Sequence, residues 1–290
     1  MFWVSLRCQV KNMLHHKEFF FALFVSTAVV LIAFCVDLRS YLGNDIMYRL
    51  PAWCYWGLAG PGNEYIGIYG SMNASRVTIS LWIQLLLPFL ATMAYAFCHY
   101  DAVKSGVLKE LLPRTGAGAY YRSSACAVFV GGSLIIFIPL LLQQLLLLIV
   151  FPGSLPINNP GGYPVVDDYV QRMGIQCFAA LQINHPYLYN LLLSVIPAVT
   201  GGVLAYCAYT LSLFFHRSRF LVLTLTGVVL WLVPQFAFQN DVNLGPYVRD
   251  IFAMQPSSDF AKWGMVFGAL LAVNIVLTEL KIHKFKDRLS

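Results

Sequence analysis

Long apolar runs alternate with short polar segments along the whole chain. An α-helix rises about 1.5 Å per residue, so about 20 apolar residues are needed to cross a hydrocarbon core roughly 30 Å thick. Runs of about this length occur six times, and none of them contains Asp, Glu, Lys, Arg or His. The predicted spans are residues 19–36, 77–98, 123–151, 188–215, 220–238 and 263–278. The pattern therefore predicts an all-α integral membrane protein in which residues 1–290 form one transmembrane domain with six helices.

Lys and Arg are concentrated in alternate segments between the spans. They are frequent in residues 1–18, in the loops after the second and fourth spans, and in the C-terminal tail. They are sparser in the outer segments, which together are much longer and comprise residues 37–76, 152–187 and 239–262. Because basic residues are retained on the cytoplasmic side, this bias predicts that both termini are cytoplasmic. The first run is followed by Asp37 and Arg39 rather than by a cleavage site, so it is expected to remain as a span.

Composition supports the membrane assignment and narrows the list of partners. Of the 290 residues, 59% are hydrophobic and only 11% are charged, and the mean hydropathy is +0.68. These values exclude an ordinary soluble enzyme. The net charge of +6 would suit nucleic acid, but the basic residues lie beside the spans, where the bilayer explains them. Nucleic acid is therefore not an expected partner.

The N-terminal segment, residues 1–17, is predicted to form an amphipathic helix at the membrane interface. Arg7 and Lys11 lie four residues apart on the face expected to meet anionic lipid headgroups. The apolar residues at helical spacing are Phe2, Trp3, Leu6, Val10, Met13 and Leu14.

A second amphipathic segment lies in the cytoplasmic loop after the second span. Residues 101–113 are predicted to form one short surface helix that ends at Pro113, and Tyr120 and Tyr121 are expected at the membrane interface. Its apolar side would comprise Val103, Val107, Leu108, Leu111 and Leu112, and its polar side Asp101, Lys104, Lys109 and Glu110. Such a helix either lies on lipid or inserts into a groove of a soluble partner, and the pattern leaves both readings open.

The spans lack the residues that membrane chemistry usually needs. Proton-coupled carriers and membrane-embedded hydrolases place carboxylates, His or metal ligands within or near the bilayer. The chain has no GxxxxGK[ST] sequence, so it does not bind ATP through a P-loop. No catalytic, cofactor-binding or metal-binding residue is assigned. The pair His15 and His16 is assigned to an interfacial basic helix rather than to a metal site.

The polar and small residues inside the spans have two readings. Gln84, Gln143, Gln144, Gln235 and Asn274 are expected to make interhelical hydrogen bonds or to line a substrate path. The glycine pairs at 131–132 and 201–202, with Ala127, Ala198 and Ala205, allow close helix approach within one subunit or between two.

Six spans with both ends inside, an N-terminal amphipathic helix and a helical first cytoplasmic loop together resemble the permease subunit of bacterial type-2 ATP-binding-cassette (ABC) exporters. The resemblance covers essentially the whole chain. Its most specific part is the pattern of Asp101, Gly106, Arg114 and Tyr120. The resemblance implies that residues 101–114 are the coupling helix, which would sit in a groove of an ATPase subunit. The residues to which it assigns this role are Asp101, Lys104, Gly106, Val107, Leu108, Lys109, Leu111 and Arg114.

The same resemblance implies a multi-pass protein of the plasma membrane that pairs with a second copy or a related permease and binds two ATPase subunits. ATP and Mg²⁺ would be bound by those partners, so this chain would carry no cofactor and would not itself be an enzyme. The apolar spans favour a lipid, a lipid-linked molecule or a hydrophobic peptide as substrate. The family also implies a re-entrant segment at 239–262, although the carboxylates of Asp241, Asp250 and Asp259 resist burial.

Two alternatives to an exporter stay open. One is an accessory or immunity protein of the membrane that transports nothing. The other is a membrane enzyme, whose outer residues Asp167, Asp168, Arg172 and His185 form no recognisable motif.

The cysteines are divided between the two sides of the predicted membrane. Cys8, Cys98 and Cys126 are expected to be free thiols on the cytoplasmic side. Cys54 and Cys177 fall in outer segments and form a disulfide there only if the two loops meet.

Overall fold

The computed structural model describes residues 2–43, 52, 78–79, 82–153, 181, 184–215, 218–232 and 260–286. These residues are almost entirely helical, and they include no strand. The predicted all-α class is confirmed for this part of the chain. The outer segments and the predicted re-entrant stretch at 239–262 lie almost wholly outside the described residues.

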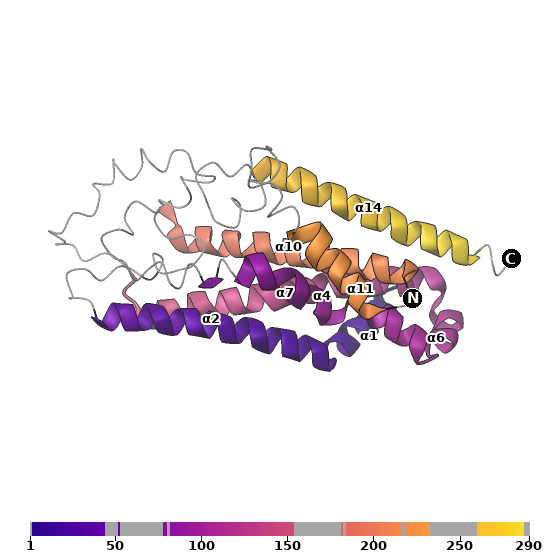
Figure 1. Ribbon diagram of the computed structural model, residues 1–290, viewed down its shortest axis with the longest axis horizontal. Helices are drawn as coiled ribbons and strands as arrows, with labels where there is room; N and C mark the ends of the chain where they lie inside the picture. Colours follow the sequence, from indigo (N-terminus) through magenta and orange to yellow (C-terminus); the bar gives the residue numbers. More distant parts are fainter. Residues whose placement is uncertain are drawn as a thin grey trace.

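Four long helices run side by side in an elongated bundle (Figure 1). They are α2 (Lys17–Gly43), α7 (Ala117–Val150), α10 (Pro186–Phe214) and α14 (Phe260–Lys286). Each contains an apolar stretch long enough to cross a bilayer. They coincide with the first, third, fourth and sixth predicted spans, and they make the chain a multi-pass membrane protein.

The second and fifth predicted spans correspond to shorter, irregular helices. The second comprises the π-helix η4 (Trp82–Leu86) followed by α4 (Leu87–Tyr95). Pro88 is the second residue of α4, and because η4 runs directly into α4, its missing N–H interrupts the hydrogen-bond ladder where the two helices join. The fifth comprises α11 (Arg219–Thr224) followed by the π-helix η5 (Leu225–Leu232). Neither is long enough in the described residues to qualify as a span, so six spans stay a prediction.

The close approach of α7 and α10 is built on glycines. A Cβ atom added at Gly132 would lie 2.6 Å from the Cβ of Ala205 and 2.9 Å from the carbonyl oxygen of Gly201. A Cβ added at Gly202 would lie 2.9 Å from the carbonyl oxygen of Phe129. Gly132, Gly201 and Gly202 therefore lie in this crossing, whereas a Cβ added at Gly131 would meet Met13 of α1. These small residues therefore pack against each other within one chain. The sequence alone did not distinguish this from packing between two subunits.

The N-terminal helix α1 (Phe2–Leu14) packs mainly against α7, and its buried residues are Ser5, Gln9 and Met13. Ser5 Oγ lies 2.7 Å from Ser123 Oγ, and the Tyr95 hydroxyl donates a 2.7 Å hydrogen bond to Gln9 Oε1. The predicted helix is confirmed, and its placement at the membrane interface stays a prediction. Ser5 and Gln9 are buried, whereas Trp3 of the predicted apolar side is 76% exposed.

The polar residues inside the spans behave in two ways. Asn274 of α14 donates to Cys207 Sγ of α10 at 2.9 Å, and Gln144 of α7 donates to the carbonyl oxygen of Tyr187 at 3.0 Å. These bonds confirm the interhelical reading for both residues. Gln143 is fully buried, and among the described residues its amide has no hydrogen-bond partner.

Candidate functional site

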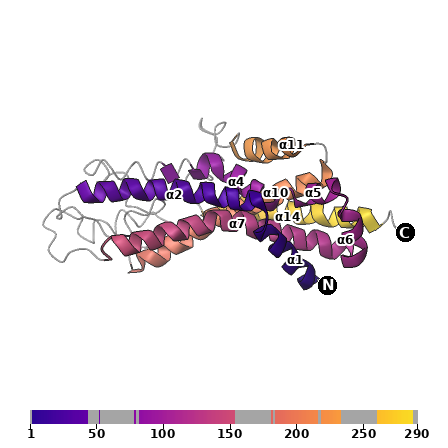
Figure 2. The same ribbon diagram turned by 90° about the horizontal axis from the view of Figure 1, so that it is seen from below.

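Both termini, the loop after α4 and the start of α11 lie at the same end of the bundle (Figures 1 and 2). The predicted cytoplasmic segments are therefore brought together, as the alternation of spans requires. The assignment of this end to the cytoplasm stays a prediction. Two features of this end are candidates for function: the loop at 98–116 and a groove beside α14.

The loop is a helix–turn–helix rather than one helix. It consists of α5 (Cys98–Lys104), a turn at Ser105, Gly106 and Val107, and α6 (Leu108–Thr115). Gly106 has a φ of +77°, a conformation that favours glycine and ends the first helix. The prediction of a continuous helix over 101–113 is therefore wrong, because the backbone conformation of Gly106 overrides the apolar periodicity.

Pro113 does not end the second helix as predicted. It lies inside α6, which continues to Thr115 and ends at Gly116, whose φ is +78°. The N–H of Gly116 still donates to the carbonyl oxygen of Leu112 at 2.9 Å, so the last turn stays closed. Pro113 is exposed, and water can satisfy the carbonyl group that its missing N–H leaves without a donor.

The apolar side chains of the loop divide into two sets. Leu108, Leu111 and Leu112 are partly buried and pack against the hydrophobic core. Val103 and Val107 remain 39% and 45% exposed. The leucines therefore attach the loop to the bundle, whereas the valines remain exposed on either side of the Gly106 turn. The other predicted coupling residues, Lys104, Lys109 and Arg114, are exposed.

Asp101 is anchored by Arg219, which begins α11. The Arg219 guanidinium forms ion pairs with Asp101 of α5 and with Glu18 of α2, the latter at 2.9 Å. It also lies over the rings of Phe97 and Tyr100, 5.8 Å and 5.3 Å from their centroids. One side chain therefore joins the loop to the beginnings of two other helices.

In the sequence, Arg219 contributes to the charge bias of the loop after the fourth span, and Glu18 by itself carries no distinguishing pattern. A signal for the cluster was present, because Glu18 and Asp101 are carboxylates at the same predicted end of two different spans.

Tyr120 and Tyr121 face the interior of the bundle, and their predicted position at the depth of the membrane interface stays a prediction. Both are buried at the beginning of α7, and their rings lie 6.4 Å and 5.5 Å from the ring of His99. The Tyr209 hydroxyl donates to the carbonyl oxygen of Tyr121 at 3.4 Å. The two tyrosines face inward because α5 and α10 supply aromatic and polar neighbours there.

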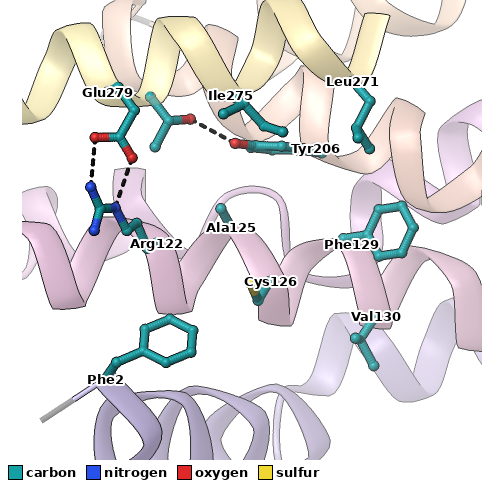
Figure 3. A pocket seen from close by; sticks show the side chains of 11 residues that line it. Phe2, Arg122, Ala125, Cys126, Phe129, Val130, Tyr206, Leu271, Ile275 and Glu279 are labelled. Carbon is teal, nitrogen blue, oxygen red and sulfur yellow. Dashed lines mark hydrogen bonds and ion pairs between the residues drawn. The ribbon is translucent and has the colours of Figure 1, made fainter. Parts of the chain in front are cut away.

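The second feature is a groove lined by α7, α10 and α14 and by Phe2 of α1, with a volume of about 590 Å³ (Figure 3). At one end Arg122 donates to both carboxylate oxygens of Glu279, at 2.7 Å and 2.8 Å. The hydroxyls of Tyr206 and Thr278 lie 3.0 Å apart beside this ion pair. From the sequence, Arg122 was counted only among the basic residues of the loop after the second span. Glu279, which directly follows the sixth predicted span, was not singled out.

The remaining predicted residues are only partly covered. Cys54, Cys177, Asp167, Asp168 and Arg172 lie outside the described residues. His185 is exposed just before α10. Cys8, Cys98 and Cys126 are free thiols, as predicted. The part of the chain that is described contains no group of three or more His, Cys, Asp or Glu side chains able to hold a metal ion.

Comparison with known protein families, curated proteins and solved structures gave no match. Functional conclusions therefore depend on the geometry of the loop and the groove.

Proposed function

We propose that this chain is the permease subunit of an ABC exporter and that its 98–116 loop couples it to a separate ATPase subunit. The observation that supports the proposal is the exposed apolar pair Val103 and Val107 on either side of the Gly106 turn. Exposed valines at the tip of an ordered loop suit a protein groove, with Lys104 and Lys109 beside them as polar contacts.

The base of the loop suits the transmission of force. Leu108, Leu111 and Leu112 fix α6 to the core, and Arg219 connects Asp101 to Glu18 and therefore to α2. A displacement of the tip would move α5, α11 and the beginning of α2 together. In the proposed mechanism, ATP and Mg²⁺ bound by the partner shift the balance between two arrangements of these helices.

The proposed complex contains two permeases and two ATPase subunits in the plasma membrane. Its substrate is proposed to be hydrophobic or amphipathic, a lipid, a lipid-linked molecule or a peptide, because the predicted spans are mainly apolar and contain no charged side chain. This chain supplies the path, and its partner supplies the energy.

The test is affinity purification from native membranes, followed by mass spectrometry and an ATPase assay. The informative variant is Val107→Asp, since Val107 is exposed and its change should leave the fold intact. A matched control is Val4→Asp, which changes an exposed valine of α1 at the same end of the bundle. We expect an ATPase subunit to co-purify with the unaltered chain and the control, and to be lost with Val107→Asp.

Two results would contradict the proposal. Purification of the chain without any nucleotide-binding partner would favour the accessory protein instead. Co-purification that survives Val107→Asp at the unaltered level would place the ATPase contact outside the loop.

A further inference from the structure

The groove beside α14 is amphipathic along its length. Its polar end holds the Arg122–Glu279 ion pair, and its other end is formed by Phe129, Val130 and Leu271 (Figure 3). Arg122 and Val130 are eight residues apart on α7, so the groove extends about 12 Å along the helix. The polar end lies toward the end of the bundle that carries both termini. The groove therefore has the polarity of a lipid in the adjoining leaflet.

The size of the groove suits a molecule rather than a few waters. Its volume of about 590 Å³ falls within the range of roughly 300–1,000 Å³ found for small-molecule sites. The walls between the two ends are mostly apolar, including Ala125 and Ile275, and the Tyr206 and Thr278 hydroxyls that also line them bond to each other. An acyl chain that lies along α7 and α14 would cover these walls.

The ion pair selects the headgroup by its two charges. Arg122 and Glu279 are side by side, and their side chains are 57% and 35% exposed. A guanidinium has five N–H donors, of which Glu279 accepts two, so Arg122 has further donors for a phosphate. A simple anion would be attracted by Arg122 and repelled by Glu279 at nearly the same distance. A headgroup with a phosphate and a primary ammonium complements both charges.

We propose that the groove binds one ethanolamine phospholipid, with its phosphate on Arg122, its ammonium on Glu279 and one acyl chain along α7 and α14. The site is independent of the exporter proposal, since nothing in it requires an ATPase. The lipid would join α14 to the bundle on the side where the groove separates it from α7.

The experiment is native mass spectrometry of the purified chain in mild detergent, with equal amounts of phosphatidylethanolamine, phosphatidylcholine or phosphatidylglycerol added separately. The choline headgroup lacks N–H donors for Glu279, and the glycerol headgroup carries no cation. We expect a single bound phosphatidylethanolamine to be retained about tenfold more than either other lipid, the effect of one charge-assisted hydrogen bond.

Two variants test the location. Cys126→Trp fills the groove, whereas the matched control Cys35→Trp changes an exposed free cysteine of α2 outside it. The exchange Arg122→Glu with Glu279→Arg keeps the ion pair between α7 and α14 but reverses its direction. We expect Cys126→Trp and the exchanged pair to lose the bound phosphatidylethanolamine, and Cys35→Trp to keep it. Thermal unfolding of each variant shows that the fold is retained.

Three outcomes would overturn the proposal. These are equal retention of the three lipids by the unaltered chain, retention of phosphatidylethanolamine by Cys126→Trp at the unaltered level, and undiminished retention by the exchanged pair. The comparison of headgroups uses the unaltered chain, so it decides the question even if a variant fails to fold.

Discussion

The glycine contact between α7 and α10 is the feature of the fold most sensitive to a single methyl group. Ordinary contacts between carbon atoms are about 3.5–4.0 Å long, whereas a Cβ at position 132 would lie 2.6 Å from the Cβ of Ala205. The same atom would lie 2.9 Å from the backbone oxygen of Gly201, which cannot rotate away. Gly132→Ala must therefore separate the helices locally by about 1 Å. We expect it to lower the free energy of unfolding by about 1–3 kcal/mol, the usual cost of overpacking.

A matched control exists on α14. Gly264 and Gly268 are helical, and no atom of the described residues lies within 4 Å of a Cβ added at either. Gly264→Ala and Gly268→Ala should therefore be neutral or stabilising by up to about 1 kcal/mol, since alanine is the better helix former. All three variants make the same chemical change, so a difference between them reports packing alone.

The assay is unfolding by sodium dodecyl sulfate in mixed micelles, followed by the circular dichroism of the helices. Because Gly132 and Gly201 belong to one chain, the loss of stability should not depend on protein concentration. Equal unfolding free energies for Gly132→Ala and Gly264→Ala would refute the close contact. A loss that appears only at concentrations where the chain associates would assign the glycines to an interface between subunits.

Three further predictions address the anchor, the buried polar residues and the orientation. Arg219→Gln removes the ion pairs with Asp101 and Glu18 and should lower the free energy of unfolding by about 1 kcal/mol. Amide hydrogen exchange across residues 98–116 should become faster, and unaltered exchange would show that the ion pairs do not hold the loop. Asn274→Leu should lower the free energy of unfolding by about 1 kcal/mol, because its hydrogen bonds are lost. Gln143→Leu should raise the free energy of unfolding, because it removes buried polar atoms that have no partner in the described structure. A change of the unfolding free energy in the same direction for both variants would contradict the assignment. The orientation can be tested with a variant whose sole cysteine is Cys8, which is exposed on α1. This cysteine should react with a membrane-impermeant maleimide only after the cells are permeabilised. Labelling in intact cells would reverse the predicted orientation.

Much of the candidate loop was predictable, because its pattern is local. The residues that contact the core, Leu108, Leu111 and Leu112, were already assigned to one helical face. The break at Gly106 was not predicted, although the glycine is visible in the sequence. A glycine inside a helical pattern is either tolerated at a cost or adopts a positive φ, and periodicity does not distinguish the two.

The sequence by itself determined that this is an α-helical membrane protein, because the length of an apolar run is a local property that the bilayer thickness converts into a span. It also located α10 to within two residues at each end, whereas α2, α7 and α14 each extend six to eight residues beyond the predicted span at one end. The gathering of the basic segments at one end followed from the alternation of the spans.

The tertiary structure alone decided which side chains meet. Arg122 and Glu279 are 157 residues apart, and Arg219 and Asp101 are 118 apart. Several basic and acidic residues share this end of the bundle, and any of them is a chemically suitable partner for another. Which pairs form, and whether glycine faces meet inside one chain, depends on how each helix is rotated and which helix lies beside it. Those choices are made by side-chain packing across the whole bundle, which no local pattern encodes.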